Sequence, residues 1–457
     1  MSKERAVVLG ASMSGLLMAR ILSDVFPEVV VIDRDRLSGS PNGYGSRRGV
    51  PQGQHIHVLI SRGQQIIEDL FPGSTAELVA AGVPTLDHLG DVRWFLSGNR
   101  IRQAESGLRV LSASRPLLED RIRERVTALP GVTLVERCDA AGLVTDPDHR
   151  RVTGVRIIRH ADGSAEQVLP ADLVVDATGR GSRTPAWLEG LGYQRPVCET
   201  VEIDVGYATA MFRTSSVSLD GDKGIVIAPT PGHPRGGALQ ILERDRCLVT
   251  LIGVRGDRPP TGRDEYLDFA RSLQFPDLHD AIADAEWLGE PVPYRFRSGM
   301  RHRYERLDRF PEGFLVVGDA FCSFNPIYAQ GMTVAALEAV TVRKHLAKGS
   351  LPGSRDVLRA VARTVDVPWD MAVGGDLAFP GVEGKRDAKV RFGNVYIPRV
   401  HAAAARDSTV AVAFARVSGL VDPPSALMRP GIALRVLRHS AGPSLGSPDR
   451  VPQAQPG

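Results

Sequence analysis

The sequence predicts an α/β fold with a parallel sheet, an inserted β-sheet domain and a C-terminal helical region. Three features predict this organisation. Residues 5–33 read as strand, tight turn, helix and strand, and residues 195–299 contain short strand-like runs separated by Gly/Pro turns. Residues 354–439 have mostly helical spacing, with a Pro/Gly interruption from Asp366 to Gly384. With 457 residues, the chain is long enough for one large α/β unit with an inserted or appended domain.

The segment RAVVLGASMSGLLMARILSDVFPEVVVID, residues 5–33, carries the strongest local signal. Gly10 lets the chain turn sharply after the first strand, and Gly15 lets the helix pack closely on it, so that the first helical amides face the pyrophosphate of a dinucleotide. Asp33 follows Gly10 by 23 positions, near the roughly 20-residue offset at which an acid meets the ribose hydroxyls. Ser12 replaces the middle glycine of G-x-G-x-x-G, and its hydroxyl could itself donate to a phosphate. This segment predicts a Rossmann-like nucleotide site.

Composition narrows the class of protein. The 56 basic and 53 acidic residues nearly cancel, which argues against a nucleic-acid partner. The first strand begins close to Met1 and no apolar run approaches the roughly 20 residues that span a bilayer, so we expect a cytoplasmic protein without a signal peptide. The four cysteines are scattered without a CxxC pair and read as reduced thiols: Cys138, Cys198, Cys247 and Cys322.

Arginines follow the nucleotide strand and open a later helix. The loop after Asp33 carries four of them, which could lie over an adenine or near phosphates or form a solvated basic loop: Arg34, Arg36, Arg47 and Arg48. Ser114 is the expected N-cap of a helix over residues 114–126. Arg115 stands at the start of this helix, where a cation opposes the helix dipole unless an anion is near. It is therefore a candidate phosphate or flavin contact, with a surface arginine as the alternative.

His55 and His57 lie two positions apart, a spacing that invites a metal-site interpretation. No third His, Cys or carboxylate has convincing spacing, so we expect structural or cofactor-lining histidines and no metal.

Two further strand-to-glycine corners lie downstream. In DLVVDATGRGSR, residues 172–183, an apolar strand ends at Asp176 and Gly179 follows. In residues 313–338, a strand is broken at Gly318 and Asp319, Pro326 stiffens a loop, and a helix follows Gly331. Because ligands bind at the carboxyl ends of parallel strands, we expect these corners to lie beside the first one.

In this order, GASMSG with Asp33, DATGRGS and GDAFCSFNPIYAQGM resemble the single-component, group A FAD-dependent monooxygenases of the aromatic-hydroxylase type, from Ala6 to roughly Leu346. The segments RRGVPQGQHIHVLISRGQQIIEDLFPG, SRPLLE, DATGRGSR and NPIYAQGM look most like bacterial epoxidases that act on polyether-precursor polyenes. The implied fold is glutathione-reductase/p-hydroxybenzoate-hydroxylase-like. Its expected parts are a FAD-binding domain in residues 1–194 and 300–350, a substrate sheet domain in 195–299, a helical region in 351–439 and a disordered tail in 440–457.

The resemblance implies roles for particular residues. The FAD pyrophosphate would lie on Gly10, Ser12, Ser14 and Gly15, with Asp33 on the adenosine ribose and basic contacts from Arg34, Arg47 and Arg115. Asp176 and Gly179 match a motif associated with both FAD and the pyridine nucleotide. Asp319 would accept from a ribityl hydroxyl, and the loop with Pro326, Gly331 and Met332 would flank the isoalloxazine. No side chain is expected to act as a nucleophile.

The resemblance also implies a reaction. NAD(P)H reduces the flavin, O2 forms a C4a-hydroperoxide, and oxygen is delivered to an alkene of a hydrophobic natural-product intermediate, free or carrier-bound. Aromatic ring hydroxylation on the same scaffold is the nearest alternative. It needs a base, for which His233, His302 and Tyr304 are candidates. A flavin-dependent halogenase is disfavoured, because no lysine lies between Lys3 and Lys223 and WxWxIP is absent. A non-catalytic flavin-binding protein and a non-redox cyclase are the remaining alternatives.

Overall fold

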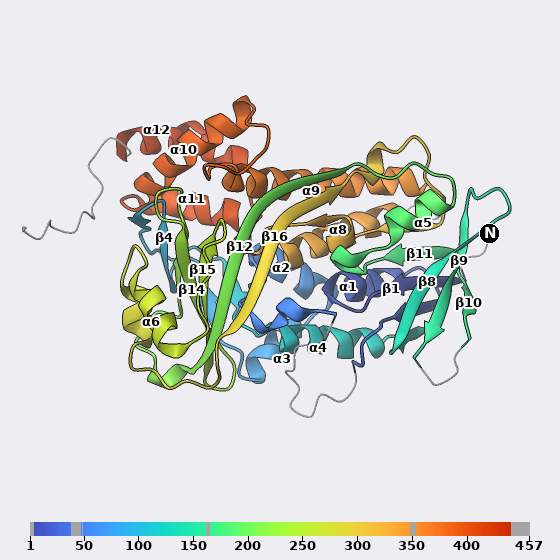
Figure 1. Cartoon of the computed structure of the whole chain (residues 1–457), viewed down its shortest axis with the longest axis horizontal. Helices are drawn as coiled ribbons and strands as arrows, with labels where there is room; N and C mark the ends of the chain where they lie inside the picture. Colours follow the sequence, from blue (N-terminus) through green and yellow to red (C-terminus); the bar gives the residue numbers. More distant parts are fainter. Residues whose placement is uncertain (1–3, 38–46, 48, 161–164, 348–352, 440–457) are drawn as a thin grey trace, which may run out of the picture.

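The computed structural model describes residues 4–37, 47, 49–160, 165–347 and 353–439. Arg48 and the tail from residue 440 lie outside this range. Counted over the described residues, five parallel strands form a sheet with the order β17-β11-β1-β2-β7. Their bounds are β1 (Arg5–Leu9), β2 (Glu28–Ile32), β7 (Val132–Val135), β11 (Leu173–Asp176) and β17 (Phe314–Val316). This is the predicted Rossmann-like sheet, and Figure 1 shows it at one end of the molecule.

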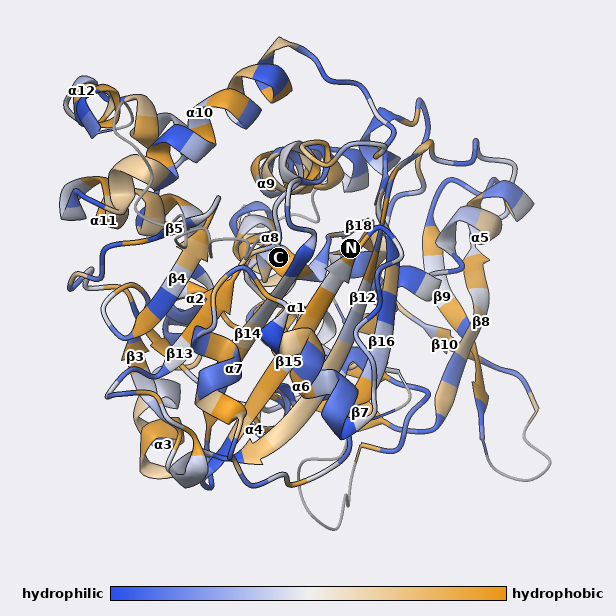
Figure 2. Ribbon diagram, turned by 60° about the vertical axis from the view of Figure 1, so that its left-hand side comes forward, coloured by the Kyte–Doolittle hydropathy of each residue, from blue (hydrophilic) through white to orange (hydrophobic). Residues whose placement is uncertain are grey.

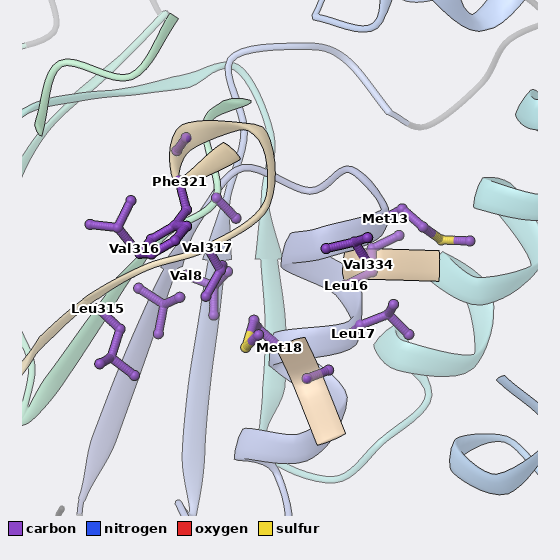
Figure 3. Close-up of a cluster of buried hydrophobic side chains, with 14 of the residues drawn as sticks. Val8, Met13, Leu16, Leu17, Met18, Leu315, Val316, Val317, Phe321 and Val334 are labelled. Atoms are coloured by element: carbon purple, nitrogen blue, oxygen red, sulfur yellow. The ribbon is translucent and has the colours of Figure 1, made fainter. Parts of the chain in front are cut away.

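Helices α1 (Met13–Leu22) and α8 (Gly331–Leu346) pack beside this sheet and share one apolar cluster. Helix α1 follows β1, and α8 packs against it. Figure 3 shows Met13, Leu16 and Leu17 of α1 gathered with Val334 of α8, and Val8 beside Phe321. All six side chains are at most 2% exposed. One close-packed apolar cluster therefore holds the two helices against each other and against the sheet.

Three antiparallel strands among the described residues extend the domain in the order β10-β9-β8. They are β8 (Cys138–Thr145), β9 (Val152–Arg159) and β10 (Gln167–Pro170), after which the chain re-enters the parallel sheet as β11. Between β2 and β7 lie helices α2 (Ser61–Leu70), α3 (Ser74–Ala80) and α4 (Arg115–Thr127), and the short strands β3 (Thr85–Asp87) and β6 (Arg109–Leu111).

The second large sheet has eight strands in the part of the chain that the structure describes, in the order β18-β16-β12-β15-β14-β13-β4-β5. We call it the mixed sheet, because β13 runs parallel to β4 while its other pairs are antiparallel. Its strands are β4 (Val92–Leu96), β5 (Asn99–Arg100), β12 (Cys198–Arg213), β13 (Gly224–Ile227), β14 (Arg235–Leu242), β15 (Arg246–Val254), β16 (Val292–His302) and β18 (Cys322–Ser323). The sheet thus takes strands from both sides of residues 195–299. Figure 1 shows β12 and β16 crossing the middle of the molecule.

One face of the mixed sheet is closed by helices α6 (Arg263–Arg271) and α7 (Asp277–Ile282). Alternate residues of β12 and β15 fill the apolar layer beneath them, including Ala208, Phe212 and Val249. Figure 2 shows α6 and α7 in front of β14 and β15. We call the opposite face the open face, because α6 and α7 do not cover it. It carries Tyr207, Thr209 and Thr250, and it contacts residues that precede the mixed sheet in sequence, such as His55.

The C-terminal region is helical, as predicted, with α9 (Ser354–Asp376), α10 (Ala388–Ala404), α11 (Ser408–Ser418) and α12 (Pro430–His439). The expectation that a Pro/Gly interruption begins at Asp366 is wrong, because α9 continues through Pro368 to Asp376. A proline removes only one backbone donor, and Pro368 is buried where α9 packs on the protein. Helix α5 (Thr184–Gly190) follows the second glycine corner. Among the described residues, no helix combines the length and apolar character needed to cross a membrane.

Candidate dinucleotide and active site

The three glycine corners meet at one edge of the parallel sheet. Leu9 pairs with Asp176, which pairs in turn with Val316, so the strands β1, β11 and β17 end in register. A Cβ added to Gly10 would lie 2.6 Å from the Ala177 carbonyl oxygen. One added to Gly179 would lie 3.9 Å from Asp319 Cβ, so the second and third corners also adjoin.

The first corner requires its glycines. Gly10 has a φ of +97°, in the left-handed region, and its amide donates to the Ile32 carbonyl at 2.8 Å. A Cβ on Gly15 would lie only 1.8 Å from the Gly10 carbonyl oxygen. Helix α1 has no acidic residue in its first turn and no side-chain cap, so its first amides are free to face an anion. The Ser14 hydroxyl is buried and has no hydrogen-bond partner within the described residues.

A charged cluster surrounds this turn. The Arg47 guanidinium contacts both Asp33 and Asp35 at 3.2 Å, and its Nη2 lies 2.7 Å from Glu119 Oε1. Arg115 Nη2 lies 2.9 Å from Glu119 Oε2. All five side chains are at most 14% exposed. Each of the two guanidiniums is therefore paired with at least one carboxylate beside the helix N-terminus.

Glu119 and Asp35 were not predicted as site residues. Burial alone would raise the pKa of Glu119, but Arg115 and Arg47 lower it, and the net pKa lies below its ordinary value. The i, i+4 spacing of Arg115 and Glu119 in SRPLLE is the sequence signal that could have identified this pair.

Ser12 and Asp33 are held by protein groups in this corner. The Ser12 hydroxyl donates to Glu119 at 3.2 Å and accepts from Arg115 at 2.9 Å. Asp33 Oδ2 accepts from the Ala11 amide at 2.7 Å, while Oδ1 accepts from the Asp35 amide at 2.8 Å. Each carboxylate oxygen has further lone pairs, so Asp33 retains capacity for a ribose hydroxyl. Arg34 is exposed beside it, which leaves its predicted cofactor contact a prediction.

The second corner is organised around Asp176, which is fully buried. Its carboxylate accepts from the Thr178 hydroxyl at 2.6 Å and from the Ser182 and Thr184 hydroxyls, each at 2.5 Å. These bonds fix the turn that presents Gly179, whose φ is +78°. Asp176 thus shapes this corner through the backbone, and a contact between Gly179 and a cofactor stays a prediction.

The third corner combines a tight turn with two buried acids. Gly318 has a φ of +62°, and its amide donates to Glu338 Oε2 at 2.7 Å. Glu338 is fully buried, its Oε1 has no partner within the described residues, and burial raises its pKa to about 8. Asp319 is half-buried, and desolvation raises its pKa against the opposing effect of Arg180 and Arg115. Arg180 itself donates to the Ser298 carbonyl at 2.8 Å.

The predicted flavin-flanking segment is a one-turn 3₁₀ helix, Pro326–Tyr328, followed by α8. Ala329, between them, has a φ of +53°. The first turn of α8 has no acidic residue and no side-chain cap. Gln330 Oε1 and Thr333 Oγ1 are buried without partners in the described chain. The helix begins at Gly331, so Met332 lies in its first turn, and a contact between this loop and a flavin ring stays a prediction.

The open face of the mixed sheet brings polar side chains to His55. The imidazole Nδ1 of His55 lies 2.7 Å from the Thr209 hydroxyl, which lies 2.7 Å from the Thr250 hydroxyl. The ring of His55 is centred 5.1 Å from that of Tyr294 and 6.4 Å from that of Tyr207. Burial lowers the pKa of His55 to about 4, so the imidazole is neutral at pH 7.

The remaining candidate residues lie apart from this face or serve other contacts. His57 Nδ1 meets the His55 carbonyl at 3.0 Å, and burial lowers the pKa of His57 to about 4. Over the described ranges, no group of three or more His, Cys, Asp or Glu could hold a metal ion. His233 contacts the Ser272 carbonyl beside α6. The ring of His302 is centred 5.6 Å from that of Tyr304 and tilted against it, and the other ring neighbours of Tyr304 are Phe310 and Phe321.

Sequence relatives support a shared family. No family model matches the chain. The protein Rv3254 of Mycobacterium tuberculosis is 37% identical over 394 residues, covering 82% of this chain and 81% of Rv3254. A kynurenine 3-monooxygenase of Salinispora tropica is 25% identical over 366 residues, covering 74% of this chain and 72% of that protein.

Solved structures share the fold at low sequence identity. A variant of the flavin-dependent brominase Bmp2 has a TM-score of 0.66 at 15% identity, covering 95% of this chain and 99% of its own. The p-nitrophenol 4-monooxygenase PnpA of Pseudomonas putida gives 0.63 at 14% identity, covering 92% and 99%. PqsL of Pseudomonas aeruginosa, solved with 2-aminobenzoylacetate, gives 0.59 at 17% identity, covering 82% and 95%. The chain therefore belongs to the protein family of Rv3254, and it has the α/β fold of FAD-dependent monooxygenases.

Proposed function

We propose that this protein is a cytoplasmic FAD-dependent monooxygenase that consumes NAD(P)H and O2 and epoxidises an alkene of a hydrophobic natural-product intermediate. The observation that carries the proposal is the convergence of the three glycine corners at the carboxyl ends of β1, β11 and β17. In open α/β sheets this edge is where dinucleotides bind.

The residues present fit FAD. Two helix N-termini, those of α1 and α8, are uncapped at this edge, and the Ser14 hydroxyl is buried without a partner. The amides of α1 would hold the diphosphate, and Asp33 the adenosine ribose. Asp319 would accept a hydrogen bond from a ribityl hydroxyl. Within the described residues no hydrogen bond to its carboxylate is found, and burial, which raises its pKa, disfavours the charged carboxylate unless a donor binds to it.

When bound, FAD supplies the redox chemistry, accepting hydride from NAD(P)H and activating O2. The protein's part is to bind, orient and exclude water. The first amides of α8 would stabilise negative charge on the pyrimidine edge of the ring. The open face of the mixed sheet, with Tyr207, Thr209 and Tyr294, would orient the substrate. Epoxidation requires no protein nucleophile or base, in keeping with the predicted absence of catalytic side chains.

Aromatic ring hydroxylation is the second candidate. Two observations favour it: the relationship to a kynurenine 3-monooxygenase, and the neutral His55 on the same face as Tyr207. A neutral imidazole can accept a phenolic proton directly or through a hydroxyl. The two candidates differ in product, so they can be separated chemically.

The test is product analysis with the purified protein. After FAD uptake is measured by the visible spectrum, the holoprotein is incubated with NADH or NADPH under ¹⁸O₂ and a panel of polyenes, terpenoids and phenols, free and carrier-bound. One ¹⁸O on a former alkene supports epoxidation, and one ¹⁸O as a new phenol supports hydroxylation. A colourless protein that takes up no FAD would contradict both candidates.

A further inference from the structure

The flavin-flanking loop is tied to the C-terminal helical region by one buried carboxylate, that of Asp376. Asp376 is the last residue of α9 and is 3% exposed. Its Oδ1 accepts from Asn325 Nδ2 at 2.8 Å and from the Tyr328 hydroxyl at 3.0 Å. Asn325 precedes the 3₁₀ turn Pro326–Tyr328 and Tyr328 ends it, so a single oxygen holds both ends of this turn.

Neighbouring residues are adapted to this contact. A Cβ on Gly375 would lie 2.2 Å from the Tyr328 hydroxyl oxygen, so glycine is needed for Tyr328 to reach Asp376. The side chain of Asn325 also accepts from the Ile327 amide at 3.2 Å, which closes the turn from inside. Ala329 follows with a φ of +53°, a backbone state that a non-glycine residue keeps only when its surroundings hold it there.

The carboxylate of Asp376 is buried and, within the part of the chain that the structure describes, has no cationic partner. Among the described residues its titratable neighbours are two hydroxyls, those of Tyr328 and Tyr207. Tyr207 projects from β12 on the open face of the mixed sheet, and its hydroxyl is buried without a partner in the described chain. Burial raises the pKa of Asp376 to about 6. Burying a carboxyl costs free energy that an apolar residue would not cost. Its presence here indicates that the hydrogen bonds from Asn325 and Tyr328 are needed to hold the loop.

We propose that Asp376 is a positioning residue: through Asn325 and Tyr328 it fixes the loop that carries Pro326, Gly331 and Met332 against the redox cofactor. The inference rests on the proposed function, because it assigns that loop to the isoalloxazine. Its consequence is that α9, far from the glycine corners in sequence, controls how tightly the reaction site excludes water.

A loosened loop should change the fate of oxygen. In the coupled reaction, substrate, O2, NAD(P)H and a proton give oxygenated substrate, water and NAD(P)⁺. When water enters, O2, NAD(P)H and a proton give H2O2 and NAD(P)⁺ without product. The fraction of NAD(P)H converted to H2O2 therefore reports the order of the loop separately from the rate of turnover.

The experiment compares Asp376→Ala, Asp376→Asn and Tyr328→Phe with Asp370→Ala. Asp370 lies on the same helix and pairs with Lys389 at the surface, so it is the matched control. Amide hydrogen exchange over residues 325–332 is measured on the apoprotein. H2O2 yield per NAD(P)H and the visible flavin spectrum are measured on the holoprotein.

We expect Asp376→Ala to exchange at least tenfold faster over residues 325–332 and to raise the H2O2 yield several-fold. Asp376→Asn, which keeps an acceptor oxygen, should restore most of the wild-type values, and Tyr328→Phe should lie between. Wild-type exchange and H2O2 yield in Asp376→Ala would overturn the inference. Should Asp376→Ala fail to fold, Tyr328→Phe decides the matter: values equal to those of Asp370→Ala would overturn it. A wild-type protein without FAD contradicts the proposed function instead, and the exchange measurement still tests the loop.

Discussion

The N-termini of α1 and α8 lie at the same edge of the protein but are built in opposite ways. Beside α1, the guanidiniums of Arg47 and Arg115 alternate with the carboxylates of Asp33 and Glu119. Beside α8, no ion pair to the buried acids Glu338 and Asp376 is found among the described residues, and burial raises the pKa of Glu338 to about 8 and that of Asp376 to about 6.

The difference matches the two halves of the proposed cofactor. A diphosphate is permanently anionic, and the uncapped amides of α1 present the positive end of the helix dipole to it, with the guanidiniums of Arg47 and Arg115 nearby. The ring changes its charge during reaction, and a water-poor corner makes the helix amides act more strongly on that change. In the proposed function, charged groups would position the cofactor, while the buried acids and the amides of α8 would adjust its reactivity.

The strongest way to break the first corner is Gly15→Val. Its Cβ would lie 1.8 Å from the Gly10 carbonyl oxygen, so β1 and α1 must separate. We expect a loss on the order of 3 kcal/mol in the free energy of unfolding and no FAD uptake, measured by denaturant titration and flavin absorbance. Gly190→Ala, where nothing lies within 4 Å, is the control. FAD uptake by Gly15→Val at the wild-type level would contradict the assignment.

Glu119→Ala tests the charge network. It leaves two buried guanidiniums with fewer partners, and breaking a buried ion pair costs about 3–5 kcal/mol. FAD binding should weaken and the thermal midpoint should fall, as followed by fluorescence titration and calorimetry. The same substitution at Glu124, an exposed partner of Arg121 on the same helix, should cost under about 1 kcal/mol. Equal effects at the two positions would show that the network does not support the turn.

Glu338→Gln tests the neutral corner through pH. The folded-state pKa, about 8, lies above the ordinary 4.5, so the folded protein binds this proton more tightly than the unfolded chain. The resulting stability is complete below pH 4.5 and is lost as the pH rises through 8. Wild-type stability should therefore fall between about pH 4.5 and pH 8 and level off above pH 8, and that fall should be smaller in Glu338→Gln. Parallel pH profiles of the thermal midpoint would show that Glu338 is not protonated in the folded protein.

Arg34→Ala should have the smallest effect. The side chain is exposed, in contrast to Arg115, which is 8% exposed. Exposed charges contribute under about 1 kcal/mol, so the dissociation constant for FAD should change less than about fivefold. Fluorescence titration in low and high salt checks this. A change as large as that of Arg115→Ala would place Arg34 among the main cofactor contacts.

Local patterns predicted the elements of the parallel sheet and its three corners. The strand that ends at Asp176 and the helix capped by Ser114 occur where they were expected, because both depend on neighbours in sequence. Contacts between residues far apart in sequence were not predicted. His55 meets Thr209 across 154 positions, and Asp376 meets Asn325 across 51. The periodicity of a sequence does not encode such contacts. In addition, Pro368 suggested that the helix is interrupted before Asp376, whereas α9 continues to that residue.

The pairing of β4 with β13 has a consequence for synthesis of the protein. Val92 lies beside Gly224, so β4 leaves the ribosome well over a hundred residues before its parallel neighbour exists. Until then, the nascent chain presents an unpaired strand edge that a chaperone could shield or another chain could capture. The mixed sheet therefore cannot be completed before β13 has been synthesised. Expression at reduced translation speed, which prolongs the exposure of β4, should increase the fraction of aggregated protein.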